Sequence, residues 1–215
     1  MPILAPVPAD ARLRRWLQLS GGLLVYGFSA ALLIEAALGI DPWDVLHQGI
    51  SRNTGISIGS VTIGVGVLVL LGWIPLKQRP GLGTVANAIV IGLAMDLSLN
   101  LLPTPDETVA RVVFLGLGIV FNGIATGLYI GAGMGPGPRD GLMTGIAARG
   151  HSIRVVRTGL EVTVLALGWA LGGNVGIGTV AYALLIGPIA HVTIPAFTIA
   201  GAQPVVPADA HTSIP

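Results

Sequence analysis

Five ionisable side chains lie within long apolar stretches of the sequence, where a charge is costly and therefore chemically informative. They are Glu35, Asp96, Arg157, Glu161 and His191. In membrane proteins such residues usually face the bundle interior or a wet cavity, and they mark the path of a substrate, ion or proton. We therefore predict that these five side chains line a substrate or ion pathway.

Arg157 and Glu161 are four residues apart, so on a helix they share one face. A rise of about 1.5 Å per residue places Glu161 near the middle of a spanning helix that begins at Ser152. Two interpretations stay open: a pathway whose pairing breaks and re-forms, or a buried structural ion pair. For a buried pair, loss of one partner would cost about 3–5 kcal/mol, because the remaining charge is left unpaired.

Two segments, 42–53 and 138–149, are too short to cross a membrane and each begins with Pro-x-Asp. Proline suits the first turn of a helix, because its missing N–H would be unpaired there. We expect two short re-entrant or interfacial helices, each next to a glycine-rich hinge. Their aspartates are expected to cap them, and the arginine to contact a lipid headgroup or a substrate on the inner side. The motif residues are Pro42 and Asp44 in the first segment, and Pro138, Arg139 and Asp140 in the second.

These motifs belong to an internal repeat that covers most of the chain. An offset of 96 residues aligns Pro42 with Pro138, and an offset of 95 aligns the Gly-Leu-Gly-Thr-Val-Ala at 81–86 with the Gly-Ile-Gly-Thr-Val-Ala at 176–181. Such self-similarity has to be recognised before the fold is interpreted, because it identifies the structural unit. The chain is therefore one unit written twice, 12–103 and 104–199.

The repeat also relates some of the candidate pathway residues. Asp96 aligns with His191, and Asp with His is a pairing that can relay protons; a histidine bonded to a neighbouring carbonyl is the alternative. Glu35 stands where the second copy has Gly131, on a stripe of small residues with a spacing of four. Such a stripe favours close helix packing. Glu35 therefore either turns inward with the stripe or reaches out to the membrane interface.

Composition identifies the class of protein. The 215 residues are 53% hydrophobic and 10% charged, and they include 32 glycines, which is typical of a polytopic membrane protein. We predict an all-α membrane protein with about six crossings, each near the roughly 20 residues that a spanning helix needs. The tails 1–11 and 200–215 are expected to be disordered. The expected crossings are 16–39, 57–75, 84–102, 109–132, 152–171 and 177–199.

The lysines and arginines predict the orientation. With the N-terminus in the cytoplasm, most of them fall on the inner side, as the positive-inside rule requires, and both termini are then cytoplasmic. Three crossings per copy turn the second copy upside down. Inverted repeats with interrupted helices are the architecture of many secondary transporters, whose substrate site lies where the repeats meet.

Several function classes are disfavoured. A net charge of +1 without a basic patch argues against nucleic-acid binding, and the absence of cysteine, metal-ligand spacing and a P-loop argues against a metal, a cofactor or ATPase activity. Ser29 and His191 offer a superficial rhomboid-like protease dyad. Ser29 aligns with Ala125 in the second copy, however, and has no loop nearby to form an oxyanion hole. We expect no enzyme.

Three motifs resemble the YczE-like branch of the YczE/YyaS/YitT bacterial membrane proteins. They are Asp-Pro-Trp-Asp-Val-Leu-His-Gln-Gly at 41–49, Lys-Gln-Arg-Pro-Gly-Leu-Gly-Thr at 77–84 and Gly-Met-Gly-Pro-Gly-Pro-Arg-Asp-Gly-Leu-Met at 133–143. The similarity extends from about residue 16 to 195. It implies a bacterial plasma-membrane protein and supplies neither a substrate nor catalytic residues.

The residue pattern favours a transporter or permease for an unidentified small molecule or ion. The alternative is a non-transporting membrane scaffold or partner protein, and homo-oligomerisation stays open. The expected partners are the lipid bilayer and the transported species.

Overall fold

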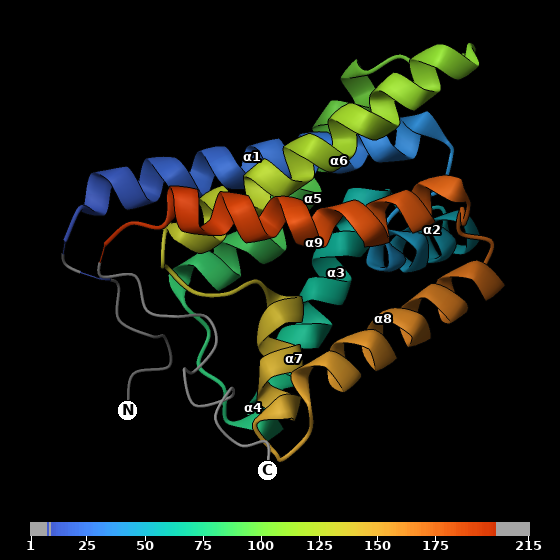
Figure 1. The fold of residues 1–215 in the computed structure, drawn as a ribbon. Coiled ribbons are helices and arrows are strands. Elements are labelled where there is room, and N and C mark those ends of the chain that lie inside the picture. Colours follow the sequence, from blue (N-terminus) through green and yellow to red (C-terminus); the bar gives the residue numbers. More distant parts are fainter. Residues whose placement is uncertain (1–7, 9, 201–215) are drawn as a thin grey trace.

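The computed structural model describes residues 8 and 10–200, and every regular element within them is a helix (Figure 1). Each half of the chain has a long helix and then a short helix, followed by three helices in the first half, where α4 continues α3, and by two in the second. The predicted disordered tails lie outside the described residues, apart from residues 8, 10, 11 and 200. The helices are α1 Arg12–Ala36, α2 Pro42–Thr54, α3 Ile58–Leu71, α4 Trp73–Leu76 and α5 Leu82–Leu101 in the first half, and α6 Thr108–Gly131, α7 Pro138–Ala147, α8 Ile153–Ala170 and α9 Ile177–Phe197 in the second.

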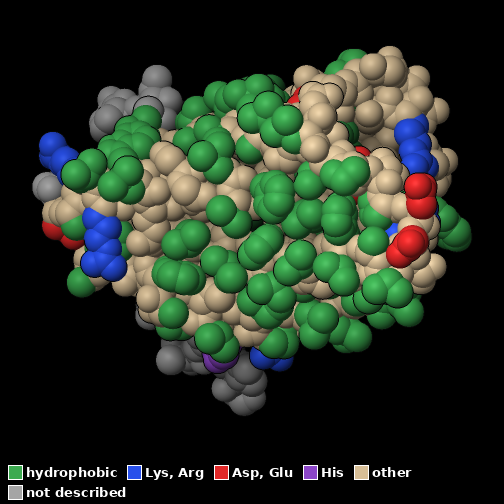
Figure 2. Space-filling view, turned by 90° about the horizontal axis from the view of Figure 1, so that it is seen from above, with side chains coloured by type: hydrophobic (Ala, Val, Ile, Leu, Met, Phe, Trp, Pro, Cys, Tyr) green, Lys and Arg blue, Asp and Glu red, His purple; other side chains and the backbone are tan. Residues whose placement is uncertain are grey.

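The surface has the character of a membrane protein. Five helical segments are long and apolar enough to cross a bilayer: α1, α3 continued by α4, α5, α6 and α9. Large apolar side chains are exposed along them, and Figure 2 shows charged side chains gathered mainly at the two ends of an apolar face. The predicted crossing 152–171 corresponds to α8, which carries Arg154, Arg157 and Glu161 and is not among these five. The count of six crossings therefore stays a prediction.

Glycine lets the long helices pack closely. α1 and α6 lie side by side along the upper part of the view (Figure 1), with α5 against α1 and α9 against α6. A Cβ placed on Gly27 would come within 2.7 Å of the Ile91 carbonyl oxygen, and one on Gly127 within 2.7 Å of the Thr193 backbone. Close packing of the predicted glycine stripe on α6 is therefore confirmed.

The hinges before the two short helices cross over to the opposite half. The backbone N–H of Gly83, at the start of α5, donates to the carbonyl of Met134 at 2.8 Å, and that of Gly178, at the start of α9, donates to Leu38 at 2.7 Å. In the sequence repeat, Gly83 aligns with Gly178 and Leu38 with Met134. Each half thus holds the hinge of the other through an equivalent hydrogen bond.

The two short helices begin where the Pro-x-Asp motifs predict, with Pro42 and Pro138 in the first turn. The predicted capping role of the motif aspartates is wrong. The N-cap of α2 is Asp41, whose Oδ1 accepts from the N–H groups of Trp43 and Asp44, and α7 starts at Gly137 without a side-chain cap. Asp44 and Asp140 stand one turn further on, so their carboxylates are free to contact other helices.

Candidate functional site

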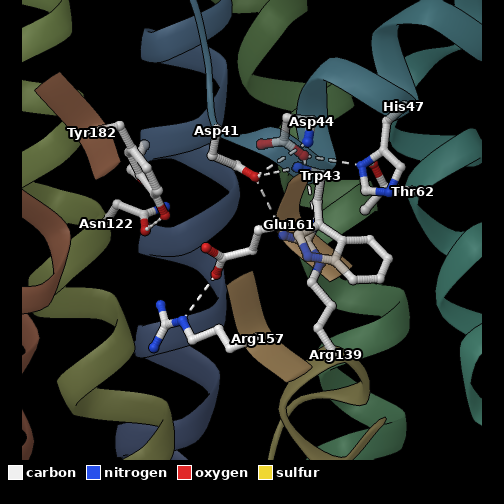
Figure 3. Close-up of polar contacts among 11 residues, drawn as sticks. Asp41, Trp43, Asp44, His47, Thr62, Asn122, Arg139, Arg157, Glu161 and Tyr182 are labelled. Carbon is white, nitrogen blue, oxygen red and sulfur yellow. Dashed lines mark hydrogen bonds and ion pairs between the residues drawn. The ribbon is translucent and has the colours of Figure 1, made fainter. Parts of the chain in front are cut away.

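Arg139 is the centre of the candidate site. It extends from the start of α7, in the second half of the chain, toward the start of α2 in the first half (Figure 3). Its Nη1 lies 3.6 Å from Asp41 Oδ1, and its Nη2 lies 3.6 Å from Asp44 Oδ1. The two carboxylates are 3% and 2% exposed, against 25% for the arginine side chain. Arg139 therefore belongs to an ion-pair cluster between the two halves, and its contact with a lipid headgroup or a substrate stays a prediction.

The Trp43 ring packs against the guanidinium of Arg139. The guanidinium carbon of Arg139 lies 5.1 Å from the centre of the Trp43 ring, within the range of a cation–π contact. In the sequence repeat, Trp43 and Arg139 occupy equivalent places. The N2 positions of the two short helices therefore contact each other across the interface between the halves.

The first turn of α2 forms a hydrogen-bonded unit with α3. His47 Nδ1 lies 3.0 Å from Asp44 Oδ1 and 3.1 Å from Thr62 Oγ1. The Thr62 hydroxyl donates its proton to the Ile58 carbonyl, so it can only accept from the ring. The proton of the neutral imidazole is therefore on Nδ1, and Nε2 is an acceptor.

The first turn of α7 is fixed from two sides. Trp73 Nε1 donates to the Pro138 carbonyl at 3.0 Å, and a Cβ on Gly141 would collide with the Trp73 ring at 2.0 Å. Asp140 Oδ2 accepts from the Tyr129 hydroxyl at 2.8 Å. These contacts set the direction in which α7 presents Arg139.

Two cavities meet at this cluster, and both are lined by Tyr26, Trp43, Arg139 and Asp140. With their open mouths included, they enclose about 550 Å³ and 630 Å³. Cavity 1 is further lined by residues of α2, α3 and α5, among them His47, Thr62, Gly66, Asn87, Ala88 and Ile91. Cavity 2 is further lined by residues of α7, α8 and α9 and by the start of α2, among them Asp41, Met143, Arg157, Glu161, Tyr182 and Ile186.

Of the five predicted pathway residues, Arg157 and Glu161 line a cavity. Arg157 Nε donates to Glu161 Oε1 at 2.9 Å. The two side chains are 59% and 33% exposed, so the pair is half-exposed and not fully buried. Figure 3 shows Glu161 on the side of the cluster that faces Asp41.

The other three predicted residues lie away from the cavities. Glu35 accepts from Thr104 Oγ1 at 2.5 Å near the end of α1. Asp96 accepts from Ser57 Oγ at 2.6 Å and from Gly59 N–H at 2.7 Å, at the start of α3. His191 is exposed on α9. In this structure Asp96 therefore bonds to the start of α3 and not to His191.

A buried polar chain links the two halves next to the cavities. Tyr182 donates to Asn122 Oδ1 at 2.9 Å, Asn122 Nδ2 donates to Ser29 Oγ at 3.0 Å, and Ser29 donates to the Tyr26 carbonyl at 2.7 Å. The Ser29 hydroxyl is thus already engaged as donor and acceptor. Within the described residues, no three His, Asp or Glu side chains are arranged to hold a metal ion.

Sequence reasoning missed Asp41, Trp43 and His47 as site residues. A signal for Asp41 was present, because aspartate directly before a proline at the first helical position is a strong N-cap pattern. His47 follows Asp44 by three residues, a spacing that places both on one face of α2. For Trp43 no local signal exists, because its partner Arg139 lies 96 residues away in the sequence.

Comparison with known proteins places the chain in a family. Residues 13–195 match the family of unknown function DUF6198. An uncharacterised protein of Haemophilus influenzae is 44% identical over 168 residues, covering 78% of this chain and 77% of its own. No solved structure gives a significant match.

Two Bacillus subtilis proteins are also similar. The uncharacterised membrane protein YczE is 36% identical over 185 residues, covering 84% of this chain and 86% of its own, and the uncharacterised protein YyaS is 28% identical over 181 residues, covering 81% and 89%. The membrane-protein relative and the five apolar helices identify a multi-pass membrane protein. This chain therefore belongs to the DUF6198 family of unknown function, with YczE and YyaS among its relatives.

Proposed function

We propose that this protein is a membrane transporter or permease for a small molecule or ion, with its site where the two halves meet. The observation that carries the proposal is the position of Arg139. It comes from one half, lies against two buried carboxylates of the other, and has a cavity on either side. Charges held inside an apolar helical protein are costly, and they usually mark a transport path.

The two cavities have equivalent linings in the sequence repeat, and this supports alternating access. In cavity 1, Thr62 and Gly66 on α3 align with Arg157 and Glu161 on α8, which line cavity 2. A repeat that is inverted in the membrane would open its two equivalent cavities to opposite sides. The α5 positions Asn87, Ala88 and Ile91 likewise align with Tyr182, Ala183 and Ile186 on α9.

The short helices fit the same function. Interrupted helices in transporters direct their N-termini toward the substrate site near the middle of the membrane. Here the first turns of α2 and α7 meet through Trp43 and Arg139. We expect a substrate to approach the cluster through one cavity and to leave through the other, without any covalent change.

The test is side-specific labelling of the two cavities. The natural chain contains no cysteine, so Ala88→Cys and Ala183→Cys can each be studied in an otherwise unchanged protein. Alternating access predicts that a small, membrane-impermeant thiol reagent modifies one variant from the cytoplasmic side and the other from the outer side. Modification of both from the same side would contradict the proposal.

A further inference from the structure

Three buried polar atoms near Arg139 have no hydrogen-bond partner among the residues that the structure describes. They are Asp41 Oδ2, Trp43 Nε1 and His47 Nε2, and their residues are 2%, 6% and 1% exposed. Asp41 lines cavity 2, His47 lines cavity 1, and Trp43 lines both. Buried polar atoms are normally paired, because an unpaired one has lost its water without compensation. Asp41 Oδ2 and His47 Nε2 are acceptors that a ligand with N–H groups can pair from the cavities, whereas Trp43 Nε1 is a donor and would need an acceptor.

The charges around Arg139 favour a positive ligand. The carboxylates of Asp41 and Asp44 face the guanidinium of Arg139, and the Arg157–Glu161 pair that lines cavity 2 is neutral as a unit. Two carboxylates against one cation in a poorly solvated place leave an excess of negative charge, which attracts a further cation. The cluster therefore suits a cation better than an anion.

Arg139 is loosely held in the place that such a cation would take. Both of its nitrogen–oxygen separations are 3.6 Å, longer than a hydrogen bond. It also covers the face of Trp43, which is the surface that aromatic cation sites present to their ligands. Arg139 is thus positioned as a tethered cation that another cation can displace.

We propose that the ligand is a small protonated amine or guanidine, which displaces Arg139 from Asp41, Asp44 and the face of Trp43. The inference rests on the proposed function, because this cation would be the transported species. Its N–H groups would donate to Asp41 Oδ2 from cavity 2, and to His47 Nε2, an acceptor in the neutral ring, from cavity 1. A quaternary ammonium ion carries the same charge but no N–H donor, and therefore binds more weakly.

The test uses methylguanidinium as the probe, on the full chain in nanodiscs, with binding measured by titration calorimetry and tryptophan fluorescence. Removing the tethered cation in Arg139→Ala is expected to tighten binding at least tenfold, because the competing internal state is lost. Adding Asp41→Asn to Arg139→Ala should weaken the binding of methylguanidinium at least tenfold. The exposed Arg149, which donates to the Pro75 carbonyl, gives the matched control Arg149→Ala, expected to bind as the natural protein does.

Two further probes of similar size separate the outcomes. Tetramethylammonium should bind at least tenfold more weakly than methylguanidinium to Arg139→Ala, and acetate should not bind. The inference would be overturned if the natural protein bound acetate and Arg139→Ala did not. It would also be overturned if Arg139→Ala bound methylguanidinium as tightly as the natural protein, or more weakly. If Arg139→Ala does not fold, Arg139→Lys keeps a charge with a shorter reach. Arg139→Lys should still bind methylguanidinium more tightly than the natural protein does. Unchanged or weaker binding to a folded Arg139→Lys would likewise contradict the inference.

Uptake of labelled methylguanidinium into proteoliposomes distinguishes this inference from the proposed function. Binding with the predicted variant pattern, but without uptake, would keep the ligand class and remove the transport function. Uptake of acetate without uptake of methylguanidinium would support the transport function and contradict the proposal of a cationic ligand.

Discussion

The two hinge glycines, Gly39 and Gly135, should not tolerate replacement by alanine. Gly39 and Gly135 align in the sequence repeat and have φ angles of +107° and +120°. A Cβ on Gly39 would lie 2.5 Å from the backbone nitrogen of Gly176, and one on Gly135 would lie 2.6 Å from Thr84 Oγ1 and 2.9 Å from the Gly81 Cα. The change to test is Gly39→Ala and, separately, Gly135→Ala.

The expected cost has two parts. An L-residue forced to a positive φ costs about 1–2 kcal/mol, and a methyl group inserted into a filled space costs about 1–3 kcal/mol more. Each variant should therefore lose at least about 2 kcal/mol. For a chain of this size, that corresponds to a drop in Tm of roughly 4–8 °C.

Thermal unfolding of the purified protein in detergent measures this effect. Gly64→Ala on α3 is the matched control, because nothing lies within 4 Å of its Cβ position, and alanine should there be neutral or favourable by about 0.5–1 kcal/mol. If either hinge variant unfolds within 2 °C of this control, as roughly expected for less than 1 kcal/mol, the crossed-hinge reasoning is wrong.

Two further predictions concern charge and topology. Glu161→Gln should change the free energy of unfolding by less than about 1 kcal/mol, because the Arg157–Glu161 pair is half-exposed. If the pair belongs to the pathway, uptake is lost both in Glu161→Gln and in the double variant Glu161→Gln with Arg157→Gln. A fully active double variant would show that the pair has only a structural role. For topology, Lys77→Cys should react with an impermeant maleimide from the cytoplasmic side and Asp106→Cys from the outer side. Reaction from one side only would remove the six-crossing arrangement with both termini in the cytoplasm.

The sequence by itself determined the class of protein, the self-similarity of its two halves and the places where the two short helices begin. These properties depend on short stretches of the sequence or on its similarity to itself. Long apolar runs specify membrane helices, Pro42 and Pro138 specify helix starts, and the repeat is found by comparing the chain with itself. The glycine stripe on α6 also indicated a close neighbour, because small residues at steps of four let another helix approach closely.

Only the tertiary structure decided which charges meet. Arg139 lies against Asp41 and Asp44 from the other half, because the crossed hinges bring the first turns of α2 and α7 together. Helical spacing predicted that Arg157 and Glu161 pair, and their place in an apolar stretch predicted a pathway. Only the packing decided that the pair stays half-exposed at a cavity while Glu35, Asp96 and His191 lie elsewhere. A sequence gives the face and the approximate depth of a charge on its own helix. The partner of that charge depends on how helices far apart in the chain are packed, and local spacing carries no information about that packing.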